Sequence, residues 1–80
     1  MLEQVRTIMA DVFKTPLETI VPDSAPETVE SWDSLNHLEL VLALEQAFGT
    51  QFTPEEIETL LSPEIIANIL DEKLRKERVA

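Results

Sequence analysis

The chain has 80 residues, and its 16 acidic and six basic residues give it a net charge of −10. A chain of this length supports a single small domain, which we take to span residues 1–80, and it is too short to enclose a deep substrate cavity. The negative charge disfavours binding to nucleic acid or anionic lipid, and the lack of cysteine excludes both a disulfide framework and a thiolate metal site.

The balance of residue types favours an all-α fold. Hydrophobic residues make up 44% of the chain, which suffices for a compact core, whereas one glycine and five prolines are too few for many hairpins. The amino-terminal stretch MLEQVRTIMADVF has a helical period instead of a basic start before an apolar run, and no apolar stretch is long enough to span a bilayer. We therefore expect a soluble, cytoplasmic monomer that does not insert into membranes.

The first predicted helix ends near Lys14, and a long connection follows it. Apolar residues recur on one face of this helix at Leu2, Val5, Ile8, Met9, Val12 and Phe13. The next segment, TPLETIVPDSAPETVESWD, contains three prolines and is predicted to be a loop. Because a free linker of this length is unusual in a small domain, the loop is expected to be held against the helices by its apolar residues. These residues are Leu17, Ile20, Val21 and Val29.

The central helix is predicted over residues 34–48, with Gly49 suited to the left-handed turn after it. Its apolar residues cover more than one stripe, at Leu35, Leu38, Leu40, Val41, Leu42, Leu44, Ala47 and Phe48. A helix packed on one side needs an apolar arc of roughly 100°. Some of these leucines are therefore expected to line a second interface or an internal cavity, unless this helix is simply the most central one.

Two further helices are marked by their caps. Thr53, Pro54 and Glu56 predict a capping box at the start of a short third helix. Ser62 and Pro63 mark the start of the last helix. Its buried face is predicted at Ile65, Ile66, Ile69, Leu70 and Leu74, and a basic tail is expected at residues 73–80. The predicted fold is a small four-helix bundle with a long first loop and a short third helix.

Ser34 lies at the predicted start of the central helix, where its hydroxyl has three possible roles. It could cap the helix, as Ser and Asp commonly do. It could act as a nucleophile with His37, three residues further on, and the adjacent Asp33; however, an exposed helix end in so small a bundle offers neither oxyanion donors nor a pocket that excludes water. Scattered carboxylates and a single histidine supply no convergent metal ligands. The third role is that of a covalent attachment point.

The motif Asp33-Ser34-Leu35, followed by LELVLALEQAFG, resembles the acyl carrier protein family, and the likeness extends over nearly the whole chain. The resemblance implies that Ser34 receives a 4′-phosphopantetheine arm from coenzyme A through a phosphopantetheinyl transferase, with Asp33 and Leu35 as its neighbours. The arm's phosphodiester would lie at a helix N-terminus, where free N–H groups favour anions. The terminal thiol then carries an acyl or aminoacyl group as a thioester while partner enzymes perform the chemistry, so the chain itself is expected to be no enzyme.

The same resemblance implies that the central helix is a recognition surface for basic patches on the enzymes that load and process the cargo. Glu39 and Glu45 match acidic positions of the family, and Leu38 and Leu42, together with Leu35, could add apolar contacts. Weak, electrostatically steered binding suits a shuttle that visits several enzymes. The family also shelters acyl chains between its helices, which the surplus leucines would suit.

Departures from the common fatty-acid carrier pattern favour a specialised carrier. Asn36 and His37 stand where that pattern has an acid and a small residue, Gln46 and Ala47 replace acids, and Trp32 replaces a small residue. The less acidic docking face favours a polyketide, peptide or surface-polymer pathway over the housekeeping fatty-acid pathway. The alternatives are an aminoacyl or peptidyl carrier, a carrier-like interaction domain that has lost the modification, and a small enzyme.

Overall fold

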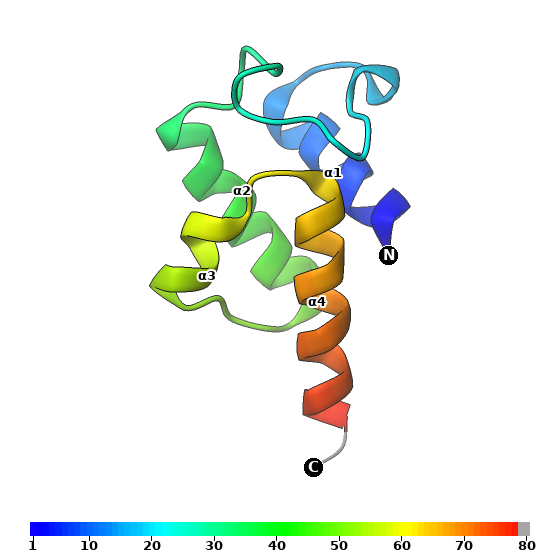
Figure 1. The fold of residues 1–80 in the computed structure, drawn as a ribbon, viewed down its shortest axis with the longest axis vertical. Coiled ribbons are helices and arrows are strands. Elements are labelled where there is room, and N and C mark those ends of the chain that lie inside the picture. The colour runs from blue at the N-terminus through cyan, green and yellow to red at the C-terminus, as the bar shows by residue number, and fades with distance from the viewer. Residues whose placement is uncertain (79–80) are drawn as a thin grey trace.

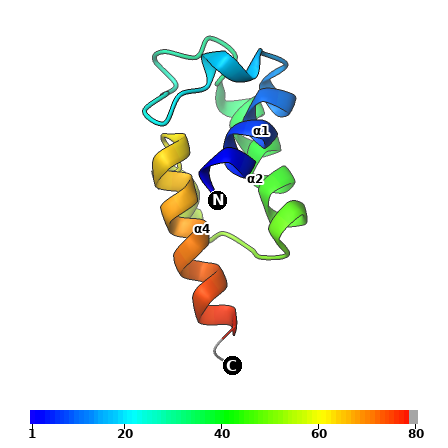
Figure 2. The ribbon, with the colours of Figure 1, turned by 90° about the vertical axis from the view of Figure 1, so that its right-hand side faces the viewer.

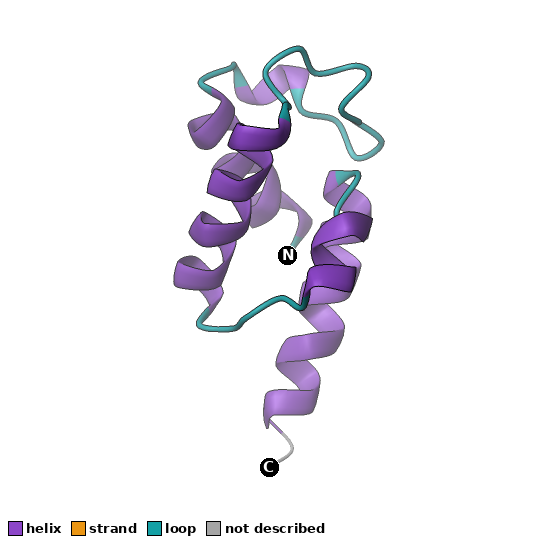
Figure 3. Ribbon diagram, turned by 90° about the vertical axis from the view of Figure 1, so that its left-hand side faces the viewer, coloured by secondary structure: helices purple, strands orange, loops and turns teal. Residues whose placement is uncertain are grey.

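The computed structural model describes the backbone of residues 1–78 and the side chains of residues 1–76. In chain order the elements are α1 (Leu2–Phe13), a short 3-10 helix η1 (Leu17–Thr19), α2 (Ser34–Phe48), α3 (Pro54–Thr59) and α4 (Pro63–Arg78) (Figure 1). Over the described residues there is no strand (Figure 3). The predicted all-α, four-helix fold with a long first loop and a short third helix is therefore confirmed. None of the helices is both long and apolar enough to cross a membrane in the part of the chain that the structure describes.

The core forms where α1 packs against both α2 and α4 (Figure 2). Helix α1 contributes one apolar face, with Val5, Met9 and Phe13 buried at the helical spacing that the sequence shows. The helix ends at Phe13 because Lys14 adopts the left-handed conformation, and its backbone N–H bonds back to Ala10 and Asp11.

The loop between α1 and α2 is held down by fewer apolar residues than expected. Ile20 and Val29 are buried, whereas Leu17 and Val21 are 38% and 43% exposed, so the expectation was wrong for these two. The loop turns through η1 at this point, and Arg6 of α1 donates hydrogen bonds to the backbone carbonyls of Leu17 and Ile20. The guanidinium of Arg6 thus fixes the loop backbone at the point where the side chains of Leu17 and Val21 were expected to do so.

Side-chain caps mark the starts of α3 and α4, as the sequence predicts. Thr53 accepts from the backbone N–H of Glu56, and Glu56 accepts from that of Thr53, which is the predicted capping box. Ser62 accepts from the N–H of Ile65 at the start of α4. In α4, Ile66 and Leu70 are fully buried, but Ile65 is 40% exposed because it lies on the outer side of the helix, contrary to the prediction.

The predicted basic tail is largely the last turns of α4, which continues as a helix through Arg78. Lys73 is not part of a free tail, since its ammonium bonds to Glu56 at 2.9 Å and lies 5.6 Å from the ring centre of Phe52. Residues 79–80 of the predicted tail lie outside the described residues.

Candidate functional site

Ser34 is the first residue of α2, and the helix is capped by the residue before it. The Asp33 carboxylate accepts a hydrogen bond of 2.9 Å from the backbone N–H of Asn36, and the Asp33 carbonyl accepts from that of His37. The capping role proposed for Ser34 therefore belongs to Asp33. Ser34 itself is exposed, and its hydroxyl takes part in no hydrogen bond with the described residues. The structure thus leaves this hydroxyl free to react.

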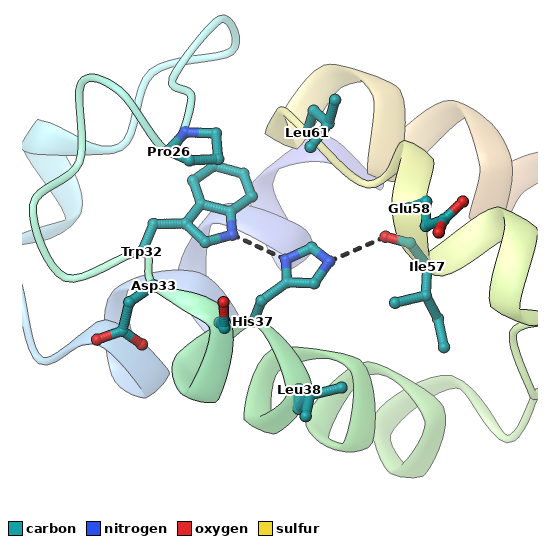
Figure 4. Close-up of a pocket in the computed structure, with 9 residues that line it drawn as sticks. Pro26, Trp32, Asp33, His37, Leu38, Ile57, Glu58 and Leu61 are labelled. Atoms are coloured by element: carbon teal, nitrogen blue, oxygen red, sulfur yellow. Dashed lines mark hydrogen bonds between the residues drawn. The ribbon is translucent and has the colours of Figure 1, made fainter.

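His37 shares a helix with Ser34, but its imidazole is engaged elsewhere. Its Nδ1 accepts from the indole N–H of Trp32 at 2.9 Å, so the proton lies on Nε2, which donates to the backbone carbonyl of Ile57 at 2.9 Å (Figure 4). Both ring nitrogens are thus occupied by partners other than Ser34. The imidazole is not placed to act as a base for Ser34, and His37 is half-buried.

A pocket of about 430 Å³ opens beside Ser34. It is lined by Pro26, Trp32, Asp33, Ser34, His37, Leu38, Ile57, Glu58 and Leu61 (Figure 4). The indole and the imidazole lie between the loop and α3, and the Asp33 carboxylate points away from them (Figure 4). The indole N–H and both imidazole nitrogens are paired with one another or with Ile57, so the pocket presents mainly apolar side chains, together with the carboxylates of Asp33 and Glu58.

The surplus leucines of α2 lie on its outer surface. Leu40, Val41 and Leu44 are buried against the rest of the bundle. Leu35, Leu38 and Leu42 are 67%, 55% and 58% exposed, so they form a second apolar stripe and are not core residues of a central helix. This stripe begins one residue after Ser34, and Leu38 also lines the pocket.

The two acids expected to contact partners differ in their surroundings. Glu39 is exposed on α2. Glu45 is half-buried, and its Oε2 accepts a hydrogen bond of 2.9 Å from the backbone N–H of Phe52, which fixes the loop between α2 and α3. Glu45 therefore has a structural role that its position in the sequence did not reveal.

The pocket also contains residues that the sequence reasoning did not assign to a site, namely Pro26, Ile57, Glu58 and Leu61. The pairing of Trp32 with His37 could have been anticipated, because a buried indole N–H needs an acceptor and the chain's only histidine lies five residues further on. The link from His37 to α3 could not, since it spans 20 residues. No cluster of three or more potential metal ligands occurs among the described residues.

Comparisons with known proteins show the family to which the chain belongs. Residues 3–70 match the family described as a phosphopantetheine attachment site. An acyl carrier protein of Thermosynechococcus vestitus is 33% identical over 91% of this chain and 90% of its own length. One of Petrotoga mobilis is 30% identical over 92% and 87%. The solution structure of a holo acyl carrier protein from Geobacter metallireducens superposes with a TM-score of 0.83 at 25% identity, covering 95% of this chain and 87% of the other.

The four-helix fold and the match to the phosphopantetheine attachment family place the chain among carrier domains, a class of proteins that hold a cargo on a prosthetic arm. The chain belongs to the acyl carrier protein family. It is thus a carrier with a covalently attached 4′-phosphopantetheine, and members of this family are carriers and not enzymes.

The amino end of α2 fits the arm chemically. Among the first backbone N–H groups of α2, only that of Asn36 is taken by the Asp33 side chain. The N–H groups of Ser34 and Leu35 have no helical partner and favour an anion such as a phosphodiester. When bound, the arm supplies the terminal thiol that this cysteine-free chain lacks.

Proposed function

We propose that Ser34 is the attachment residue, and that residues 1–80 work as one carrier domain. In this proposal the chain is a cytoplasmic monomer that holds acyl intermediates as thioesters and passes them between enzymes of a fatty acid, polyketide or related pathway. The observation that carries the assignment is the exposed, unbonded hydroxyl of Ser34 at the first position of α2. An attached arm would start beside the pocket, because Ser34 is one of its lining residues.

The apolar lining of the pocket supports an acyl cargo over an aminoacyl one. Leu38, Ile57 and Leu61 face a bound chain, while the polar atoms of Trp32 and His37 are already paired. An α-ammonium group would lose hydration against these apolar side chains, and its only anionic partners in the lining would be the carboxylates of Asp33 and Glu58. We therefore favour the acyl class, with the aminoacyl carrier as the alternative.

We also propose that the phosphopantetheinyl transferase and the enzymes that load and process the cargo dock on α2 through basic patches. The exposed stripe of Leu35, Leu38 and Leu42 supports this proposal, together with Glu39. Glu45 adds negative charge to the same helix, but one of its oxygens is engaged with Phe52. Rim charges of this kind raise association rates more than they raise affinity.

The test is the intact mass of the protein after incubation with coenzyme A and a broad-specificity phosphopantetheinyl transferase. Wild type is expected to gain one phosphopantetheinyl group, and Ser34→Ala none. Ser31→Ala is the matched control, because it removes a serine hydroxyl from the loop just before Asp33 and should be modified like wild type. Modification of Ser34→Ala would refute the assignment. Unmodified wild type with several transferases would favour an interaction domain that has lost the arm.

A further inference from the structure

Helix α3 is held in place by contacts with other parts of the bundle, and not by burial of its own side chains. It has only six residues, none of them buried, although Ile57 packs in part against the core. A helix this short is marginal without tertiary support. Polar side chains from two other helices add to the support from the core, since Lys73 of α4 bonds to Glu56 and His37 of α2 bonds to the carbonyl of Ile57.

His37 supports α3 at the carboxyl end of that helix. The carbonyl of Ile57 belongs to the last turn of α3, where it accepts the backbone N–H of Leu60 at 3.3 Å in addition to the imidazole N–H of His37. The imidazole is itself held by the indole of Trp32, which is buried on the loop side, and the ring centres of Trp32 and Phe13 lie 5.4 Å apart. Trp32, His37 and the Ile57 carbonyl therefore connect the loop, α2 and α3 in one chain of hydrogen bonds that crosses the wall of the pocket beside Ser34 (Figure 4).

We propose that this chain of hydrogen bonds is a latch that sets how far α3 can move from α2, and that His37 is therefore the residue that limits the length of apolar cargo the pocket accepts. While these hydrogen bonds are intact, an acyl chain attached at Ser34 reaches the indole of Trp32 and the imidazole of His37. It can go no deeper into the pocket without breaking their hydrogen bonds. With the latch removed, α3 keeps its ion pair with Lys73 and the core residues Phe52 and Leu60 on either side of it, but it loses its direct hydrogen bond to α2, so its distance from α2 can increase. This latch rests on the proposed attachment of cargo at Ser34.

The latch can be tested without relying on the transferase. The chain has no cysteine and one tryptophan. Ser34→Cys therefore introduces a single thiol at the rim of the pocket, to which straight alkyl groups of increasing length can be joined as mixed disulfides. Two readouts follow the alkyl chain: the emission of Trp32, measured relative to the shortest chain in the same variant, and the rate at which a soluble thiol reduces the mixed disulfide.

In Ser34→Cys alone, both readouts are expected to level off once the alkyl chain fills the pocket. With His37→Phe added, which keeps a ring but makes neither hydrogen bond, they should level off at a longer chain. The longest mixed disulfides should then be reduced about fivefold more slowly than with His37 present, the factor that corresponds to one net hydrogen bond of ~1 kcal/mol. His37→Asn, too short to reach Ile57, should behave like His37→Phe. Gln46→Ala, an exposed change on the same helix, should behave like the parent.

Levelling off at the same or a shorter chain length in both His37 variants, with melting transitions that remain cooperative, would refute the latch. If only His37→Phe loses its cooperative melting transition, the result for His37→Asn decides whether the latch is refuted. Because the alkyl chain is joined through the introduced thiol, failure of the transferase to modify wild type contradicts the proposed function and not the latch. An unchanged dependence on chain length contradicts the latch and not the proposed function.

Discussion

Glu39 and Glu45 show how two acids of one helix can have separate tasks at the scale of single residues. Both project from α2, but only the carboxylate of Glu45 accepts a hydrogen bond from a backbone N–H, that of Phe52. Phe52 is 8% exposed, so its N–H would have poor access to water in the absence of Glu45. The local sequence around the two acids gives no sign of this difference, because the partner of Glu45 lies in the following loop.

We expect Glu45→Ala to lower the free energy of unfolding by about 1–2 kcal/mol, since it leaves a buried N–H without a partner. Glu39→Ala should leave that free energy unchanged within ~0.5 kcal/mol, as expected of an exposed site. It should instead slow association with the transferase at low salt. Urea unfolding and stopped-flow association, applied to both variants, separate the two roles. Equal stability of the two variants would contradict the structural role of Glu45.

At the scale of elements, the helices were predicted well because their signals are local. The range of α2 was predicted as residues 34–48 and was found at Ser34–Phe48, with Gly49 in the left-handed conformation at φ 65°. The capping box of α3 and the Ser62 cap of α4 were likewise predicted correctly. Each of these caps depends on residues within four positions of one another.

The features that the sequence did not reveal depend on long-range contacts. Arg6 holds the loop from 14 residues away, His37 holds α3 from 20, and Lys73 holds it from 17. Long polar side chains can reach many acceptors, so their partners are fixed only when the bundle is packed. The same reason applies to the candidate site: the position of Ser34 followed from the helix start, whereas the pocket beside it required the relative placement of α2 and α3.

The pairing of α3 with α4 should depend on pH. The backbone N–H of Thr53 and the ammonium of Lys73 hold the pKa of Glu56 below its ordinary value. A carboxyl with a lowered pKa in the folded state stabilises the protein at pH values above its unfolded pKa, and this contribution is lost as the pH falls through the folded pKa. Wild type should therefore be more stable than Glu56→Gln at neutral pH, and the difference should shrink as the solution is acidified below the usual glutamate range.

Urea unfolding of both proteins at a series of pH values measures this difference directly. Glu55→Gln is the control, because Glu55 is exposed on the same turn. A difference between wild type and Glu56→Gln that stays constant from neutral to acidic pH would show that the ionised carboxylate is not what stabilises α3.

At the scale of the whole molecule, charge is divided between a long acidic stretch and a basic end. From Thr15 to Glu72 the chain has thirteen acidic residues and no lysine or arginine. Two of the bases of α4 pair with acids one turn earlier on the same helix, as Arg75 with Asp71 and Lys76 with Glu72. Among the residues that the structure describes, most acids therefore form no ion pair.

Mutual repulsion among these acids should make the fold more stable when salt or divalent cations are added. We expect the melting temperature to rise with ionic strength, and to rise further with magnesium at equal ionic strength. Differential scanning calorimetry across a salt series provides the measurement. A melting temperature that responds to neither addition would contradict this account of the charge, and it would leave the carrier role intact.

The elongated shape of the bundle has a practical consequence. Its longest dimension is 39 Å, and the last turns of α4 project at one end of that axis while the amino end of α2 lies toward the other (Figure 1). A protein anchored to a bead or sensor chip through the end of α4 would therefore hold Ser34 away from the solid support. Arrays of identically oriented molecules could be made in this way, with the reactive hydroxyl of each one facing the bulk solution.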